Sequence, residues 1–202
     1  MKKRYGFICL IILLLLIGVL GPRVDTTISL DTISLPSDLD LYLVDSETEF
    51  DDITEGTEKT IVWAKEANQK TPISVVSFHG FSATRQELSP LADIVAKSLN
   101  ANLFYTRLAG HGRGSAGMIQ GSVNKWANDA NEAIEIGNRI GDKEVLIGTS
   151  TGSTLATWLA LQEKGKNISA IILMSPNYYS ACLLYTSPSP RDATLSRMPS
   201  SA

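Results

Sequence analysis

The pentapeptide Gly148-Thr149-Ser150-Thr151-Gly152 has a pattern that suits nucleophilic chemistry. The apolar run 145–147 precedes it, and apolar residues at helical spacing follow it, so a strand should turn into a helix there. Such a reversal strains the backbone of its central residue, and glycines two positions to either side avoid a clash. The pattern predicts that the Ser150 hydroxyl stands clear of the sheet edge at a helix N-terminus, where free N–H groups favour developing negative charge. A polar turn without chemistry is the alternative interpretation.

Two earlier apolar stretches also end in loops that contain histidine and glycine. The stretch 73–78 leads into His79-Gly80-Phe81, and the stretch 102–108 leads into the glycine-rich run 109–114. That run lacks the lysine and serine of a phosphate-binding loop, which argues against a nucleotide site. His79 and His111 have no third ligand at metal-binding spacing, so no metal site is predicted.

The remaining pattern predicts the elements that must position these loops. Strands are expected at 60–64, 73–78, 102–108 and 169–174, with helices between them. Residues 84–87 match a helix capping box, and the buried stripe of the helix that follows is expected to be Leu88, Leu91, Val95 and Leu99. The alternation predicts an α/β fold with a parallel sheet covered by helices on both faces.

The order of these motifs resembles that of the α/β-hydrolase superfamily over about residues 60–177, and most closely its monoglyceride-lipase and carboxylesterase-like branch, which includes the serine aminopeptidase-like hydrolases. The resemblance implies that Ser150 is the nucleophile and that the N–H groups of Phe81 and Thr151 form the oxyanion hole. It implies supporting roles in the loops for His79, Gly80, His111, Gly148 and Gly152. No cofactor is implied, because acyl transfer of this type needs none.

The chain departs from the superfamily after Ser150. An acid and then a histidine should follow the nucleophile, but both histidines of this chain, His79 and His111, precede it. Residues 182–202 are rich in serine and proline, have no periodicity, and resemble translated sequencing-adapter DNA. We therefore expect that the natural sequence diverges near Ala181, and that the printed chain is an inactive N-terminal part of the fold. The lid and the last two strands would be missing, which would leave a sheet edge unpaired.

The start of the chain predicts a targeting segment. Three basic residues, Lys2, Lys3 and Arg4, precede the unbroken apolar run 7–20, as in a signal peptide or an uncleaved signal anchor. Either would place the protein in the cell envelope, anchored in the membrane by this segment or exported.

The predicted organisation is a targeting segment at 1–22, an acidic N-terminal extension at 23–59, part of a hydrolase domain at 60–181, and an artefactual tail at 182–202. The extension reads as a linker with a short packed helix and a solvated acidic face, without chemistry. Residues 24–181 carry 12 basic and 20 acidic residues, so their net charge is −8. An acidic domain without a basic stripe argues against a nucleic-acid partner.

The sequence thus predicts a serine hydrolase of the cell envelope that cleaves a lipid or small carboxylic ester through an acyl-enzyme at Ser150. A peptidase acting on small peptides would use the same serine. A non-catalytic binding protein would keep the fold and explain the missing histidine. The residues leave both alternatives open.

Overall fold

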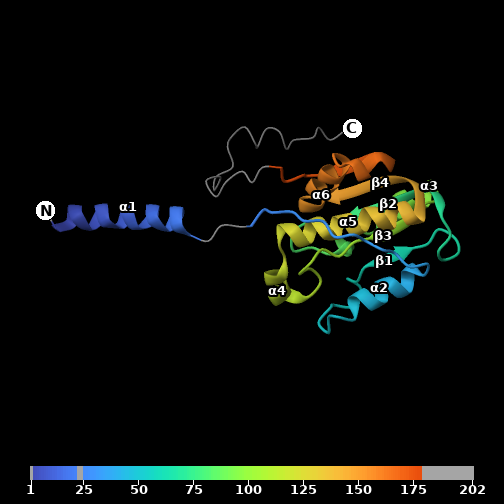
Figure 1. The fold of residues 1–202 in the computed structure, drawn as a ribbon, viewed down its shortest axis with the longest axis horizontal. Coiled ribbons are helices and arrows are strands. Elements are labelled where there is room, and N and C mark those ends of the chain that lie inside the picture. The colour runs from blue at the N-terminus through green and yellow to red at the C-terminus, as the bar shows by residue number, and fades with distance from the viewer. Residues whose placement is uncertain (1, 22–24, 179–202) are drawn as a thin grey trace, which may run out of the picture.

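The computed structural model describes residues 2–21 and 25–178, and a five-stranded sheet forms its centre (Figure 1). The strand order is β1-β3-β2-β4-β5. The strands are β1 (Thr60–Val62), β2 (Thr71–Phe78), β3 (Asn102–Tyr105), β4 (Gly141–Thr149) and β5 (Ile168–Met174). β2 pairs in parallel with β3 and β4, and β4 pairs in parallel with β5, whereas β1 is antiparallel to β3. The predicted α/β class with a largely parallel sheet is confirmed.

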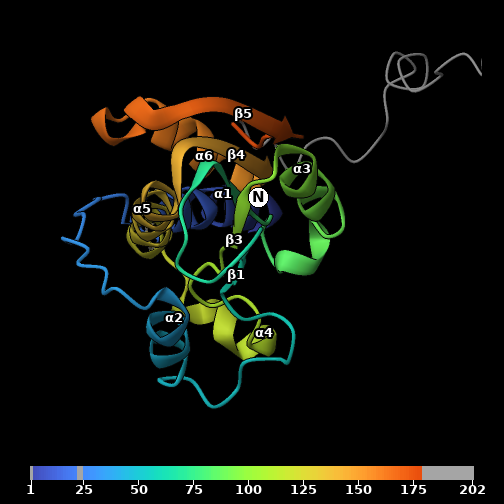
Figure 2. The same ribbon diagram turned by 90° about the vertical axis from the view of Figure 1, so that its right-hand side faces the viewer.

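Helices cover both faces of this sheet (Figure 2). One face packs against α3 (Leu91–Leu99), and the other packs against α5 (Val123–Ile140) and α6 (Thr151–Ala160). Of the two smaller helices, α2 (Leu39–Glu47) packs beside β1 on the α5 side of the sheet, and α4 (Gly114–Gly117) lies outside these layers. Single 3-10 turns occupy Arg85–Glu87, Met118–Gln120 and Glu163–Asn167.

Successive residues of the central strands point into two separate cores. Val75 and Leu103 pack with the α3 side, whereas their neighbours Val76 and Phe104 pack with the α5 and α6 side. This alternation is the two-residue period of a pleated strand. Because both faces are covered, both sets of side chains are buried, and the strands read as continuous apolar runs.

The region before α3 differs from the prediction. Residues 85–87 form only a 3-10 turn, the Thr84 side chain makes no capping hydrogen bond, and the Glu87 carboxylate accepts from the Gly80 N–H instead. Within α3 the small residues Ala92 and Ala96 face the sheet, while Leu91 and Leu99 are 40% and 39% exposed. The predicted capping box and the leucine stripe at these two positions are therefore wrong, because close packing on the sheet selects alanines at the contact.

The acidic extension contains the predicted short helix, α2. Leu39 and Leu43 of this helix are buried in the core on the α5 side of the sheet. The expectation of a solvated acidic face is wrong at Glu47, which is buried and forms an ion pair with Arg107 at 2.9 Å. A carboxylate can be buried in this way because a guanidinium neutralises it and donates two hydrogen bonds to it.

Of the two predicted terminal segments, the structure describes only residues of the N-terminal one. The N-terminal apolar run forms α1 (Lys2–Leu20), and among residues 2–21 and 25–178 no helix is both long and apolar enough to cross a membrane. The cell-envelope location stays a prediction. The predicted artefactual tail and the divergence near Ala181 lie outside the described residues.

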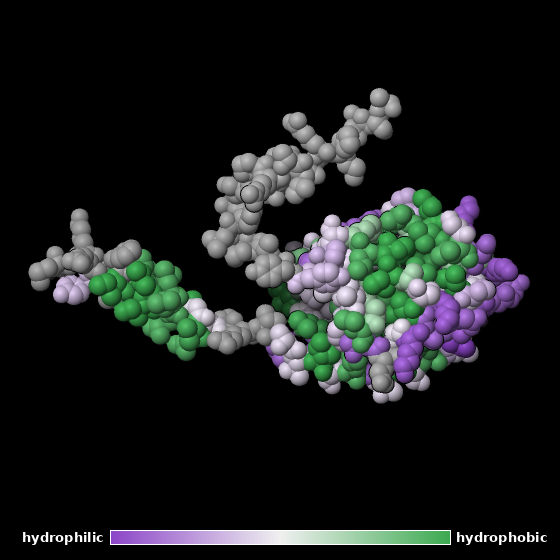
Figure 3. Space-filling model, turned by 90° about the horizontal axis from the view of Figure 1, so that it is seen from above, coloured by the Kyte–Doolittle hydropathy of each residue, from purple (hydrophilic) through white to green (hydrophobic). Residues whose placement is uncertain are grey.

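Within the described residues, β5 is an edge strand that hydrogen-bonds only to β4. Its side chains are more exposed than those of the other parallel strands, with Ile171 at 38% and Ile172 at 37%. Figure 3 looks down on this side of the molecule and shows hydrophobic surface gathered there. An edge of this kind offers unpaired backbone groups and apolar side chains to a further strand.

One carboxyl group lies in the core without a partner. Glu144 of β4 is fully buried, and both of its carboxyl oxygens lack a hydrogen bond. It fits against α5 only because residue 137 is glycine, since a Cβ there would lie 2.7 Å from Glu144 Oε1. Burial, with a smaller contribution from the charge of Glu135, raises the pKa of Glu144 to about 8. The folded chain therefore holds this carboxyl in its neutral form at pH 7.

We predict that Glu144 makes stability fall as pH rises. Its folded pKa of about 8 exceeds the ordinary value of 4.5, so between these values the folded chain binds one more proton than the unfolded chain. The free energy of unfolding should then decrease by up to about 1.4 kcal/mol per pH unit across this window. Glu144→Gln should abolish that slope in urea melts between pH 7 and pH 8, above the range in which the shifted groups His79 and Asp129 titrate.

Glu135→Gln is the control for loss of a neighbouring charge, because Glu135 is partly exposed, pairs with Lys164 on the surface and contributes less than burial to the raised pKa of Glu144. This control should retain the slope. Equal slopes in the wild type and in Glu144→Gln would contradict the prediction.

Candidate active site

Ser150 is the single residue between the end of β4 and the start of α6, and its backbone conformation is strained. Its φ of +50° and ψ of −113° fall in a region that residues with a side chain rarely adopt. Its N–H donates to the Met174 carbonyl at 2.9 Å, and its carbonyl accepts from the Thr154 N–H at 3.2 Å. The neighbouring strand and helix thus hold the strain in place.

The two flanking glycines are needed for the close approach of main-chain segments. A Cβ on Gly148 would lie 2.6 Å from the Gly152 carbonyl carbon, and a Cβ on Gly152 would lie 2.6 Å from the His79 carbonyl oxygen. Real Cβ atoms do not come this close to backbone atoms. Residues 148 and 152 therefore allow β4, α6 and the end of β2 to meet at Ser150.

The loop after β2 lies against Ser150. Phe78 and Gly148 are partners in the parallel register of β2 and β4, so the segments that follow them emerge side by side. A Cβ on Gly80 would lie 3.3 Å from the Ser150 Cβ. Within residues 2–21 and 25–178, neither the Phe81 N–H nor the Thr151 N–H donates a hydrogen bond. The structure thus brings together Ser150 and the two segments that carry these free donors.

Both ring nitrogens of His79 are bonded to the main chain. Nε2 accepts from the Leu108 N–H at 3.1 Å, which leaves the proton on Nδ1 to bond the Gly80 carbonyl at 2.9 Å. The side chain is buried, and burial lowers the pKa of His79 to about 4. His79 is therefore neutral at pH 7, with its acceptor nitrogen occupied.

His111 is held in the same way. Its Nε2 accepts from the Ser82 N–H at 3.0 Å, and its Nδ1 faces the Leu108 and Ala109 carbonyls, each at 3.2 Å. Burial is the main cause that lowers the pKa of His111. Both imidazoles connect the loop after β2 to the loop after β3, and neither has a free nitrogen for Ser150.

A groove of about 490 Å³ opens beside Ser150. Its walls are Phe81, Val123, Trp126, Thr151, Thr154, Leu155 and Asn177. The rings of Phe81 and Trp126 meet edge to face with centroids 6.1 Å apart, which makes one wall aromatic. The groove thus joins a mainly apolar wall to Phe81 and Thr151, which carry the candidate donors, and Thr151 directly follows Ser150.

The sequence did not predict the polar side of this groove, which Asn177 forms with Thr151 and Thr154. Asn177 Oδ1 accepts from the Thr154 hydroxyl at 2.6 Å, and Asn177 Nδ2 donates to Thr151 Oγ1 at 3.2 Å. The available signal was position, because Asn177 follows a parallel strand and must emerge at the same sheet edge as Ser150.

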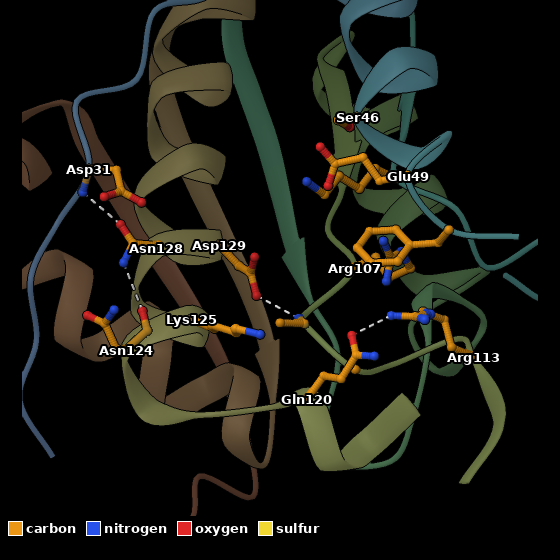
Figure 4. A pocket seen from close by; sticks show the side chains of 14 residues that line it. Asp31, Ser46, Glu49, Arg107, Arg113, Gln120, Asn124, Lys125, Asn128 and Asp129 are labelled. Atoms are coloured by element: carbon orange, nitrogen blue, oxygen red, sulfur yellow. Dashed lines mark hydrogen bonds between the residues drawn. The ribbon is translucent and has the colours of Figure 1, made fainter. Parts of the chain in front are cut away.

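A second cavity, of about 450 Å³, lies between α2, α5 and the loop after β3 (Figure 4). Most of the residues that line it are polar or charged, and none of the predicted site residues is among them. Asp129 accepts there from the Ala109 N–H at 2.6 Å, and burial raises the pKa of Asp129 to about 6. Among residues 2–21 and 25–178, no three His, Cys, Asp or Glu side chains gather as a metal site would require.

No family model and no curated protein matches this chain. Among solved structures, one of two metagenome-derived lipolytic enzymes, LipS and LipT, matches 74% of this chain and 55% of its own, with 22% identity and a TM-score of 0.56. A monoacylglycerol lipase from Paleococcus ferrophilus matches 67% of this chain and 48% of its own, with 19% identity and a TM-score of 0.44. Est1E from Butyrivibrio proteoclasticus, with ferulic acid bound, matches 59% of this chain and 48% of its own, with 18% identity and a TM-score of 0.46.

The chain spans about half the length of these proteins. At these identities a likeness establishes the fold alone, and the match to the lipolytic enzyme, with its TM-score of 0.56, does so. Together with the parallel sheet and the strained turn at Ser150, this match assigns the chain the α/β-hydrolase fold over the part that it spans.

Proposed function

We propose that this protein is a serine hydrolase that cleaves carboxylic esters through an acyl-enzyme at Ser150. The single observation that carries the proposal is the turn at residues 148–152. There a serine with φ of +50° is flanked by two glycines that no other residue could replace without a clash. Such strain persists only where the surroundings enforce it, and it is concentrated at functional sites.

The proposed reaction begins when Ser150 Oγ attacks the ester carbonyl carbon. The carbonyl oxygen becomes negatively charged, and the N–H groups of Phe81 and Thr151 donate to it. Losing one such donor typically costs about 3 kcal/mol of transition-state stabilisation. The alcohol then leaves with a proton, and water later releases the acid from the serine. The chemistry needs no cofactor.

The attacking serine needs a general base, and neither histidine among the described residues can serve as one. His79 and His111 both use their acceptor nitrogens on backbone N–H groups. We therefore propose that an acid and a histidine from a C-terminal continuation of the natural protein complete the site, and that the printed chain is inactive. The match to only 55% of a lipolytic enzyme supports this proposal.

The groove suggests which part of the substrate lies beside Ser150. Its apolar wall of Phe81, Trp126 and Leu155 suits the hydrocarbon part of a lipid or small ester. A charged peptide terminus would find no ionised partner among the residues that line it. This observation favours an ester over a small peptide as the substrate.

We propose that the protein works in the cell envelope. Support comes from the sequence alone, in which basic residues at 2–4 precede an apolar run at 7–20.

The first prediction is that Ser150 is the site of acylation. The source DNA should be read without assembly past the codon for Ala181, and the continued frame should supply an aspartate or glutamate and then a histidine. A fluorophosphonate probe should label the protein made from that frame, and Ser150→Ala should abolish labelling. Ser98→Ala, on the exposed face of α3, should leave it unchanged. A frame without a histidine would favour the non-catalytic binding protein.

The second prediction separates backbone donors from side chains. Phe81→Ala and Thr151→Ala keep both N–H groups, so the labelling rate should stay within about tenfold of the wild type. Gly80→Val should lower it by about 10²–10³, because a side chain there meets the Ser150 Cβ and the Glu87 carboxylate and displaces the donor loop. Equal losses in Thr151→Ala and Gly80→Val would count against a backbone oxyanion hole.

The third prediction concerns location. Fractionation of cells that express the protein should place it in membranes or in the exported fraction. Replacing Lys2, Lys3 and Arg4 with glutamate should reduce this partition, since the basic residues set the orientation of a targeting segment. A wholly cytosolic wild-type protein would refute the proposed location.

A further inference from the structure

The acidic extension is bonded directly to the loop after β3. The Thr54 N–H donates to the Gly112 carbonyl at 2.7 Å, and the Thr57 hydroxyl reaches the same carbonyl at 3.3 Å. Gly112 has a φ of +71°, and a Cβ there would lie 2.5 Å from Thr57 Oγ1. The fit between the two segments is therefore tight.

Glu47 and Arg107 form the buried part of this contact. The Arg107 side chain is 4% exposed, and its Nε and Nη2 donate to the Glu47 carboxylate at 2.9 Å each. The remaining nitrogen, Nη1, donates to the His111 carbonyl at 3.1 Å. A planar guanidinium can serve both acceptors at once, so Glu47 sets the direction in which Arg107 holds His111.

His111 carries this constraint to the loop beside Ser150. Its Nε2 accepts from the Ser82 N–H at 3.0 Å, and Ser82 has a φ of +59°. A non-glycine residue in this conformation needs support from its surroundings. Since Ser82 directly follows Phe81, the bond to His111 fixes the Phe81–Ser82 peptide, which adjoins the Gly80–Phe81 peptide that carries the Phe81 N–H.

We propose that Glu47 is a positioning residue for the oxyanion hole, acting through Arg107 and His111 on Ser82 and thereby on the Phe81 N–H. The inference rests on the proposed function for its catalytic consequence. Without Glu47, Arg107 would be a buried charge without a partner and would turn toward solvent, away from His111. The extension would then be part of the active-site scaffold, although it contributes no atom that touches substrate.

The first test uses the printed chain and needs no catalysis. In Glu47→Gln we expect the Ser82 N–H to exchange with solvent at least tenfold faster, measured by hydrogen exchange in NMR. The ¹⁵N resonance of His111 Nε2 should shift toward that of a ring nitrogen without a donor. Two histidines in the sequence make this resonance simple to assign.

Glu132→Gln is the matched control. Glu132 is 8% exposed and Glu47 is 9% exposed. Among the described residues, Glu132 pairs with Lys59 at 2.6 Å and accepts from the Tyr42 hydroxyl at 2.8 Å, and it makes no hydrogen bond to the loop after β3. Both variants leave one buried cation unpaired, but only Glu47→Gln should move the Ser82 and His111 signals. Unchanged signals in Glu47→Gln, or equal changes in both variants, would overturn the proposal.

A second variant covers the case in which Glu47→Gln does not fold. The double variant Glu47→Leu/Arg107→Met replaces the ion pair with apolar side chains of similar size, which folded proteins tolerate. It should show the same Ser82 and His111 changes, because the His111 carbonyl loses its donor. Wild-type signals in a folded double variant would also overturn the proposal.

The second test uses the protein made from the continued reading frame. Glu47→Gln should lower kcat for an ester at least tenfold with little change in KM, since the donor acts on the transition state. If the wild type neither turns over esters nor labels at Ser150, the proposed function fails, while the exchange measurement still decides whether Glu47 positions the loop. Faster exchange with an unchanged kcat would refute the link to the oxyanion hole.

Discussion

The close approach of three main-chain segments at Gly148 and Gly152 is the constraint on which the rest of the site depends. β4, α6 and the end of β2 meet there without room for a side chain, and Ser150 takes up the strain between them. A strained residue of this kind costs about 1–3 kcal/mol. Ser153 helps to hold it, because its buried hydroxyl donates to the Gly148 carbonyl at 2.6 Å and accepts from the Met174 N–H at 3.1 Å. β5 is therefore tied into the turn as firmly as β4.

Two of the three positive-φ serines among the described residues, Ser82 and Ser150, lie in the segments that carry the candidate donor loop and nucleophile, and each is held by different means. Ser150 is fixed by the packing of regular elements, which bond its backbone on both sides. Ser82 lies in an irregular loop and depends on one imidazole, His111, which in turn depends on neighbouring polar groups. Both histidines can do this only while neutral, since protonation of Nε2 would remove the acceptor that each offers to a backbone N–H. Burial, which lowers the pKa of both rings, thus maintains the loop geometry at pH 7.

Patterns among neighbouring residues of the sequence predicted the features of the fold that depend on neighbouring residues. The glycine spacing around Ser150 and the apolar runs of the strands were sufficient to predict the turn and the parallel sheet. Contacts between distant residues were not accessible in this way. Glu47 and Arg107 are 60 positions apart, so an acidic run gave no sign that one of its members is buried. Which residues of α3 face the sheet depends on how closely the helix approaches it. Glu144 is tolerated in the core only because Gly137 lies opposite it.

A site whose donors are main-chain N–H groups has a particular dependence on distant residues. Replacing the side chain of Phe81 or Thr151 leaves the donor in place, so such a site is insensitive to its nearest side chains. It is sensitive to whatever fixes the peptide planes, which here includes buried polar contacts from α2 and from the loop after β3. Leu39 and Leu43 of α2 are buried in the core of the sheet, so the extension packs directly on the strands that carry the candidate site. Residues 39–57 therefore belong physically with the scaffold of the proposed site, although their composition is that of a linker.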